Sequence, residues 1–103
     1  EDDMESMVEY GLSVVNNEPE EALRMYHEAI SLYEGNDRKY PLPVEIIDLS
    51  IEIVLNTAKV DMQQAINLLE IIEVEEFRLE TIDKLLLMTD DKEPKSVLED
   101  MKK

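Results

Sequence analysis

The side chains that could take part in catalysis are few in this chain. His27 is the only histidine, and there is no cysteine among the 103 residues. A serine or cysteine nucleophile needs a neighbouring base and an orienting acid, and the sequence offers no such set around one histidine. The only two glycines, Gly11 and Gly35, are too far apart to form a phosphate-binding loop. We therefore expect a protein that is not an enzyme and that holds no cofactor.

Carboxylates are abundant, so an acid–base pair or a metal site has to be considered. A di-metal helical bundle needs a Glu-x-x-His motif from each of two helices, and one histidine cannot supply both motifs. Glu73, Glu75, Glu76 and Glu80 could together hold a divalent cation weakly. A solvated acidic face is the simpler interpretation of this cluster, and it is the one we favour. No catalytic and no metal-binding residue is expected.

Net charge is the strongest signal in the composition. Asp and Glu number 26 against 10 Lys and Arg, which gives −16 at pH 7. The excess acid falls mainly in residues 1–34 and 61–83. Such a chain repels the phosphates of nucleic acids and of anionic membranes, and it attracts basic proteins, most strongly at low salt. We therefore expect a basic protein partner, with no direct binding of nucleic acid or membrane.

Length and hydropathy predict one soluble acidic helical domain over residues 1–103. The apolar fraction of 44% is enough for a core, and no uncharged stretch approaches the about 20 residues of a membrane span. Few glycines and many Glu, Leu and Ile favour helices over strands. The absence of cysteine is compatible with a reducing compartment, so an intracellular location, cytoplasmic or nuclear, is expected.

Apolar residues recur at helical spacing through the chain and predict five to six helices. The helices are expected at about residues 3–15, 18–34, 43–58, 61–73, 76–89 and 94–102. Asn17 and Asp61 are well placed to cap the second and fourth helices. No Gly or Pro separates 61–73 from 76–89, so one long helix over both segments is an alternative. The expected fold is all-α, built from stacked antiparallel helical hairpins or as an irregular bundle.

The segment 43–58 is apolar around most of its circumference. Its polar residues form one narrow seam at helical spacing, made of Glu45, Asp48, Glu52 and Asn56. A helix of this kind belongs at the centre of a helical domain or against a partner. We expect it to form the shared core, and a homo-oligomer built on its surplus apolar face is an alternative.

Residues 17–34, NEPEEALRMYHEAISLYE, resemble the second helix of a tetratricopeptide repeat. The resemblance rests on Ala22, Tyr26 and Ala29, a small–aromatic–small ladder, and on Gly11 near the position where that family keeps a small residue. The interval from Gly11 to Ala22 is one residue shorter than in the family. A weaker echo over residues 61–66 follows at an interval nearer to that of HEAT-like units. The resemblance implies stacked helical hairpins and a protein-binding surface.

These features predict a helical adaptor that binds a basic segment or helix of a partner through its acidic surface. Carboxylates are expected to supply the charge and tyrosines to act as anchors. They are Glu20, Glu21, Glu28, Glu70 and Glu73, with Tyr10, Tyr33 and Tyr40.

Two alternative functions remain open. One is an acidic decoy or assembly chaperone, whose carboxylates imitate the phosphates of a nucleic acid and mask a basic protein. The other is an oligomerisation domain. A decoy would space its carboxylates in rows on a convex surface, whereas an adaptor would gather them around a concave apolar stripe.

Overall fold

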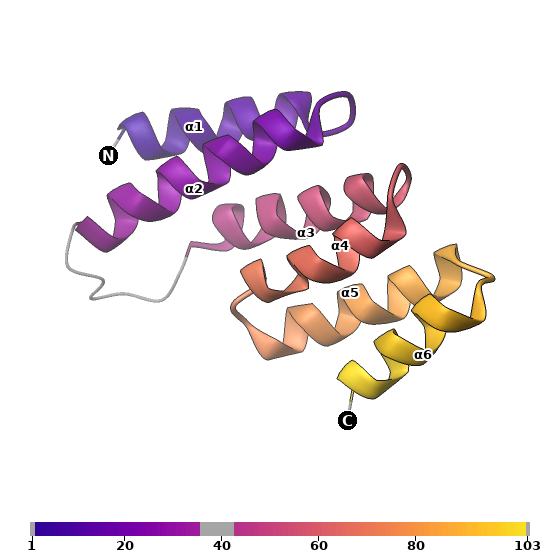
Figure 1. Ribbon diagram of the computed structural model, residues 1–103. Helices are drawn as coiled ribbons and strands as arrows, with labels where there is room; N and C mark the ends of the chain where they lie inside the picture. Colours follow the sequence, from indigo (N-terminus) through magenta and orange to yellow (C-terminus); the bar gives the residue numbers. More distant parts are fainter. Residues whose placement is uncertain (1, 36–42, 103) are drawn as a thin grey trace. The chain divides into compact units, whose positions relative to one another are not determined.

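The fold is that of a computed structural model, which describes residues 2–35 and 43–102. Within those ranges the chain forms six α-helices and one short 3-10 helix, and no described residue is in a β-strand (Figure 1). The predicted all-α fold is confirmed. None of the described helices combines the length with the apolar character that crossing a membrane requires. The elements are α1 (Asp2–Val14), α2 (Pro19–Gly35), α3 (Val44–Ala58), α4 (Met62–Leu68), η1 (Leu69–Ile71), α5 (Glu75–Met88) and α6 (Lys92–Met101).

The predicted end of the helix over 61–73 is wrong. α4 stops at Leu68, and the 3-10 helix η1 and an extended Ile72 lead into α5, so the alternative of one long helix is also wrong. The backbone N–H of Ile72 donates to the Leu69 carbonyl at 3.1 Å, which tightens the turn. Arg78 of α5 donates from Nη1 to the Ile72 carbonyl at 2.8 Å. A contact with the next helix thus satisfies a carbonyl at the break, and no Gly or Pro is needed there.

Helix starts agree with the prediction at α4 and differ at α2. The Asp61 carboxylate accepts a hydrogen bond from the backbone N–H of Gln64 at 3.2 Å, so the predicted cap is confirmed. α2 begins at Pro19, and the Glu18 carbonyl accepts its first helical hydrogen bond at 3.1 Å. The residue next to the helix is therefore Glu18 and not the predicted Asn17, because the turn after α1 is two residues longer than expected. α6 begins two residues before its predicted start.

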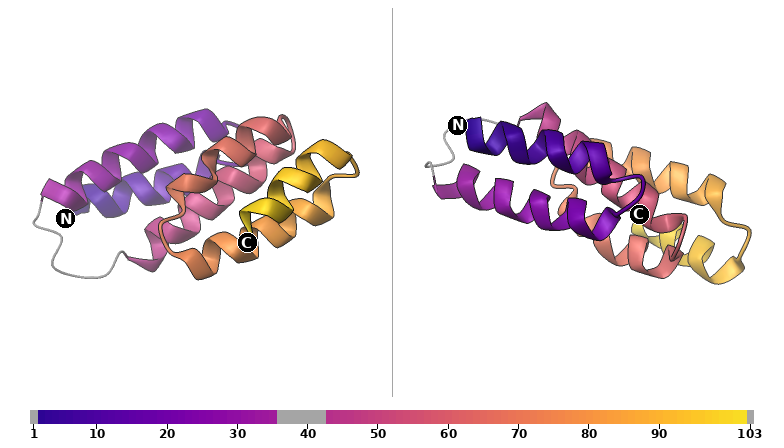
Figure 2. Two further views of the ribbon diagram at one scale, coloured as in Figure 1. Left: turned by 60° about the horizontal axis from the view of Figure 1, so that its bottom comes forward. Right: turned by 90° about the horizontal axis from the view of Figure 1, so that it is seen from above.

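The chain divides into two compact units, Glu1–Ile53 and Val54–Lys103. In the first unit, α1 and α2 lie side by side as an antiparallel hairpin closed by a short turn (Figures 1 and 2). Ala22 and Ala29 of α2 are fully buried, and Tyr26 between them is 4% exposed. Small side chains two turns apart let a neighbouring helix approach closely on this face.

In the first unit, α1 comes close to α3 at Gly11. A Cβ atom placed on this residue would lie 3.1 Å from both terminal methyl carbons of Leu49 in α3, and 3.5 Å from the Cβ of Met25 in α2. Leu49 is fully buried, so its side chain has little free space to move into. The absence of a side chain at Gly11 therefore lets α1 pack directly against α3.

Most of the apolar residues of α3 are buried, as predicted. Glu45 and Asp48 of the predicted polar seam are exposed, and Glu52 is half-buried. Asn56 at the end of the seam is instead 5% exposed, and its side-chain oxygen accepts a hydrogen bond from Lys59 Nζ at 3.3 Å. The amide is tolerated inside because it is hydrogen-bonded. The fully or almost fully buried apolar residues of α3 are Ile46, Leu49, Ile53 and Val54.

The second unit packs α4, η1, α5 and α6 around a shared apolar interior. α5 and α6 lie side by side (Figure 2), and the Lys102 ammonium meets the Asp83 carboxylate of α5 at 2.6 Å. Thr81 is buried in α5 and donates from Oγ1 to the Phe77 carbonyl at 2.8 Å. The buried apolar residues of these elements are Ala65, Ile66, Leu69, Ile82, Leu85 and Leu98.

Replacing Gly11 with Ala tests the packing of α1. At an exposed helical position this exchange stabilises by about 1 kcal/mol through helix propensity. At Gly11 we expect overpacking against Leu49 to cost about 2 kcal/mol, so the free energy of unfolding should fall by about 1 kcal/mol in urea denaturation. Ser6→Ala, at an exposed position of the same helix, is the control and should be neutral or slightly stabilising. Stabilisation by Gly11→Ala would contradict the close approach.

Candidate binding groove

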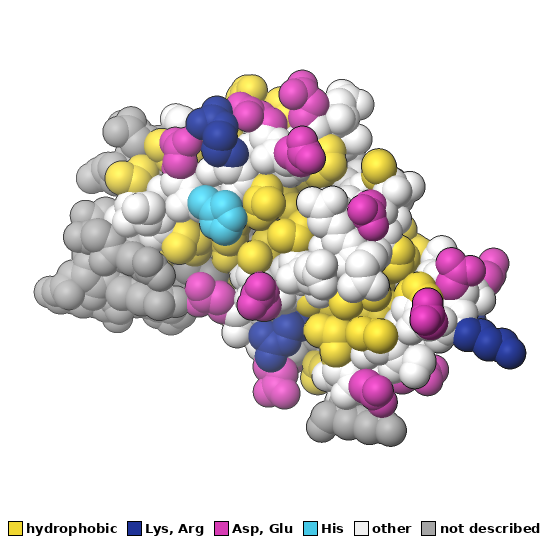
Figure 3. Space-filling view, viewed as in Figure 1, with side chains coloured by type: hydrophobic (Ala, Val, Ile, Leu, Met, Phe, Trp, Pro, Cys, Tyr) yellow, Lys and Arg dark blue, Asp and Glu magenta, His cyan; other side chains and the backbone are white. Residues whose placement is uncertain are grey.

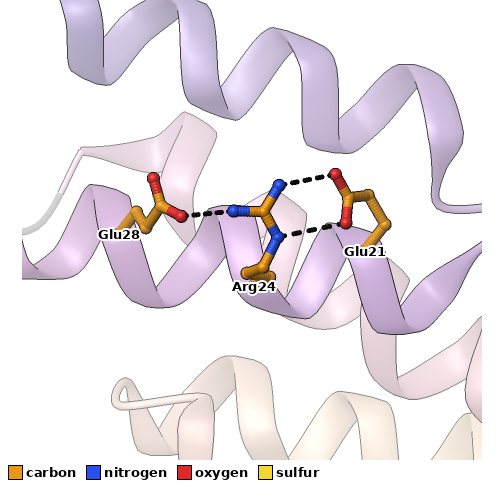
Figure 4. A network of polar contacts seen from close by, with 3 residues as sticks. All are labelled: Glu21, Arg24 and Glu28. Atoms are coloured by element: carbon orange, nitrogen blue, oxygen red, sulfur yellow. Dashed lines mark hydrogen bonds and ion pairs between the residues drawn. The ribbon is translucent and has the colours of Figure 1, made fainter.

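The predicted carboxylates of α2 lie beside an arginine. Arg24 donates from Nη2 and Nε to the two carboxylate oxygens of Glu21, at 2.8 and 3.1 Å, and from Nη1 to Glu28 at 2.7 Å (Figure 4). The residues are three and four positions apart on one helix, so helical spacing brings them together. Glu20, also predicted, is exposed. Glu21 and Glu28 are thus partly neutralised within the chain.

Arg24 also changes the titration of its neighbour. Its hydrogen bonds, together with its positive charge, lower the pKa of Glu21 below the ordinary value of 4.5, and the Tyr10 hydroxyl of α1 adds a smaller effect. The pKa of Arg24 rises in turn, mainly through its hydrogen bonds to Glu21. The network is open to solvent, so we expect it to order the surface of α2 more than to stabilise the fold.

The three predicted tyrosine anchors fall in different environments. Tyr10 of α1 is 46% exposed. Tyr33 of α2 is 9% exposed, so most of its surface is already used inside the fold. Tyr40 lies outside the described residues. Of the two described tyrosines among the three, only Tyr10 has much surface available to a partner.

Glu70 and Glu73 belong to the second unit, and both are exposed. Glu70 lines an open hollow of about 530 Å³. One carboxylate and one guanidinium are found among its described lining residues, so their charge favours neither a basic nor an acidic ligand. Its other lining residues are Ile66, Asn67, Arg78 and Met101.

A more strongly acidic hollow lies in the first unit, between α1 and the start of α3. Its volume is about 340 Å³. Within residues 2–35 and 43–102, three carboxylates and four apolar side chains line it, and none of these residues is Lys or Arg. We call this hollow the acidic groove, and its lining residues are Glu5, Val8, Glu9, Leu12, Pro43, Glu45 and Ile46.

The apolar and acidic side chains of the acidic groove differ in burial. Val8 and Ile46 are 4% and 1% exposed and form its floor. Leu12 and Pro43 are half-buried, so they offer apolar surface to a ligand, and the three glutamates are exposed. The acidic groove is therefore an apolar strip edged by negative charge.

Helical spacing explains the α1 wall of the acidic groove. Glu5 and Glu9 are four residues apart, and so are Val8 and Leu12, so each pair lines up along the helix. The opposite wall is the first turn of α3, where the Pro43 carbonyl accepts the first helical hydrogen bonds at 3.1 and 3.2 Å. None of the lining residues was among the predicted site residues. The pairing of acid with apolar stripe on α1 is visible in the sequence, whereas its meeting with α3 is a tertiary contact.

The single histidine and the four glutamates between positions 73 and 80 that could hold a cation lie at the surface. His27 is exposed, and its ring meets that of Tyr26 edge-on, with 5.7 Å between the centroids and 63° between the planes. No group of three or more His, Asp or Glu in the described part of the chain is placed to hold a metal ion. Acidic side chains are spread over the face seen in Figure 3, so charge alone marks no site. The acidic groove is the candidate site because it joins charge to accessible apolar surface.

Replacing Arg24 with Gln should raise the pKa of Glu21 toward 4.5, because the hydrogen bonds that favour the ionised carboxylate are lost. The folded-state pKa of Glu21 is below the unfolded value. Its stabilising effect is therefore present above the ordinary pKa and disappears as the pH falls through the folded-state pKa. A carboxyl-carbon NMR titration measures the shift, with Lys59→Gln as a control that should leave Glu21 unchanged. An unchanged Glu21 in Arg24→Gln would show that the pair does not form in solution.

Comparison of the chain with protein-family models, with curated proteins and with solved structures found no match. The resemblance of residues 17–34 to a tetratricopeptide repeat therefore stays a prediction from the sequence.

Proposed function

We propose that the chain is a protein-interaction module, without enzymatic activity, that binds a basic segment of a partner protein in the acidic groove. The observation that carries this proposal is the meeting of three exposed carboxylates with an apolar strip in one hollow. Charge alone attracts many cations weakly, and apolar surface alone does not select a basic partner. A hollow with both properties favours a segment that is basic and amphipathic.

The three carboxylates of the acidic groove supply attraction and selectivity. Glu5 and Glu9 of α1 stand on one wall and Glu45 of α3 on the other, and the described lining residues include no lysine or arginine. At physiological salt, charges more than about 8 Å apart are largely screened. Only a cation that is held close to these carboxylates is therefore attracted strongly by them. The remaining acid of the chain steers a basic partner toward the surface without choosing where it docks.

The apolar strip supplies a contribution to affinity that salt does not screen. Leu12 and Pro43 are half-buried and can lose further surface to a ligand. Each Å² of apolar surface removed from water stabilises a complex by about 25 cal/mol before the costs of association are subtracted. Val44, the residue after Pro43, is 61% exposed and adds apolar surface to the same turn of α3.

The carboxylates of α2 are poorer candidates for the same task. Glu21 and Glu28 already accept hydrogen bonds from Arg24, so a partner's cation would have to displace a guanidinium or share its carboxylates. The arginine also interrupts the row of negative charge that a nucleic-acid decoy would need along this helix. Concave apolar surface edged by acid supports the adaptor over the decoy.

Neutralising the carboxylates of the acidic groove should weaken its binding of a basic amphipathic peptide. The probe is a fluorescein-labelled peptide of about 14 Leu and Lys residues with Leu at helical spacing. The triple variant Glu5→Gln, Glu9→Gln, Glu45→Gln removes three charges, each contributing about 0.5 kcal/mol. Because about 1.4 kcal/mol corresponds to a factor of ten, the Kd of the peptide should rise about tenfold in a fluorescence-anisotropy titration at physiological salt.

A matched control removes the same number of charges elsewhere. Glu76→Gln, Glu80→Gln, Glu99→Gln changes three exposed residues of α5 and α6. None of the three is among the lining residues of the acidic groove, so the Kd of the peptide should rise by less than about twofold. Equal weakening in both triple variants would mean that net charge and not the acidic groove binds the peptide. Urea denaturation of each variant checks that the fold is kept.

A further inference from the structure

The α1 wall of the acidic groove is two helical turns long. Glu5 and Leu12, its outermost lining residues on α1, are seven positions apart, which is about 10 Å along the helix axis. Over that length a helical ligand presents about seven residues, whereas an extended strand presents about three. A helix can therefore place two or more apolar side chains of one stripe in the acidic groove and still carry several cations.

Negative charge lies on both sides of the apolar strip. Glu5 and Glu9 edge it on α1, and Glu45 edges it on α3. On an amphipathic helix, cations can flank both sides of the apolar stripe while the stripe itself faces the floor of the acidic groove. In a strand, alternate side chains point to opposite faces, so the neighbours of an inward apolar residue point away from the acidic groove. Charge on both edges thus favours a helical ligand.

We infer that the acidic groove takes an amphipathic helix of a partner protein, with apolar residues at i, i+3 or i+4, and i+7, and with Lys or Arg on both flanks. This inference rests on the proposed function, because it names the form of the basic segment. Leu12 and Pro43 contact the apolar stripe of that helix, and the three glutamates pair with its cations. The ligand is recognised as a helix laid into a groove and not as a strand added to an edge.

Two peptides of identical composition separate the two forms of ligand. The two peptides have the same number of Leu, the same number of Lys and the same number of Ala residues. One has Leu at helical spacing with Lys on both flanks, and the other alternates apolar and basic residues as a strand does. We expect the whole chain to bind the helical-pattern peptide at least about tenfold more tightly. NMR of that peptide, labelled with ¹³C, should show helical Cα shifts in the bound state.

A third peptide keeps the helical spacing and the number of lysines but carries them all on one flank. Its Kd should lie between those of the other two peptides, because it cannot reach Glu5 and Glu45 together. In the variant Glu5→Gln, Glu9→Gln, Glu45→Gln, the advantage of two-sided lysines over one-sided lysines should disappear. Persistence of that advantage in the variant would show that the peptide binds elsewhere.

The outcomes separate this inference from the function on which it rests. If none of the three peptides binds more tightly to the unaltered chain than to the triple groove variant, both the proposed function and the helical ligand are wrong. If the alternating peptide binds as tightly as the helical one, and both are weakened by the groove variant, the function stands and the helical ligand is wrong. Tighter binding of the helical peptide without helical Cα shifts would also overturn the inference.

Discussion

The close approach of α1 to α3 at Gly11 is the constraint on which the acidic groove depends. Because Gly11 has no side chain, α1 packs directly against the fully buried Leu49. Val8 lies about one turn before Gly11 on α1 and Leu12 directly after it, so the same approach sets how far they stand from Ile46 of α3. A side chain at Gly11 would push α1 outward and move the walls of the acidic groove apart. The packing of α1 against α3 and the shape of the acidic groove thus both depend on Gly11.

Some carboxylates of the chain are paired within the fold, and others face an open hollow. Arg24 pairs with Glu21 and Glu28 along α2, and Lys102 pairs with Asp83 between α6 and α5. Among the residues that the structure describes, the lining of the acidic groove, in contrast, contains carboxylates and no lysine or arginine. A net charge of −16 therefore describes how the whole chain attracts a partner, whereas local pairing decides which carboxylates are left to bind one.

Helical periodicity was enough to predict the helices, because the pattern that buries one face is local in sequence. The break at Leu69–Ile72 was placed only roughly, since a hydrogen bond from Arg78 holds it in place of a Gly or Pro. From the sequence alone, Tyr33 could be either a buried residue of the inner face of its helix or an anchor at an interface. The structure shows that it is buried. The acidic groove was missed because its walls come from helices that are distant in sequence, so that no spacing rule joins Glu9 to Glu45.

The most direct test is NMR chemical-shift mapping of the ¹⁵N-labelled chain during titration with the two-sided helical peptide. We expect the largest backbone shift changes in residues 5–12 of α1 and 44–46 of α3, with both segments saturating at one common Kd. Changes centred on α2 around Arg24, or changes spread evenly over the acidic residues of both units, would contradict binding in the acidic groove.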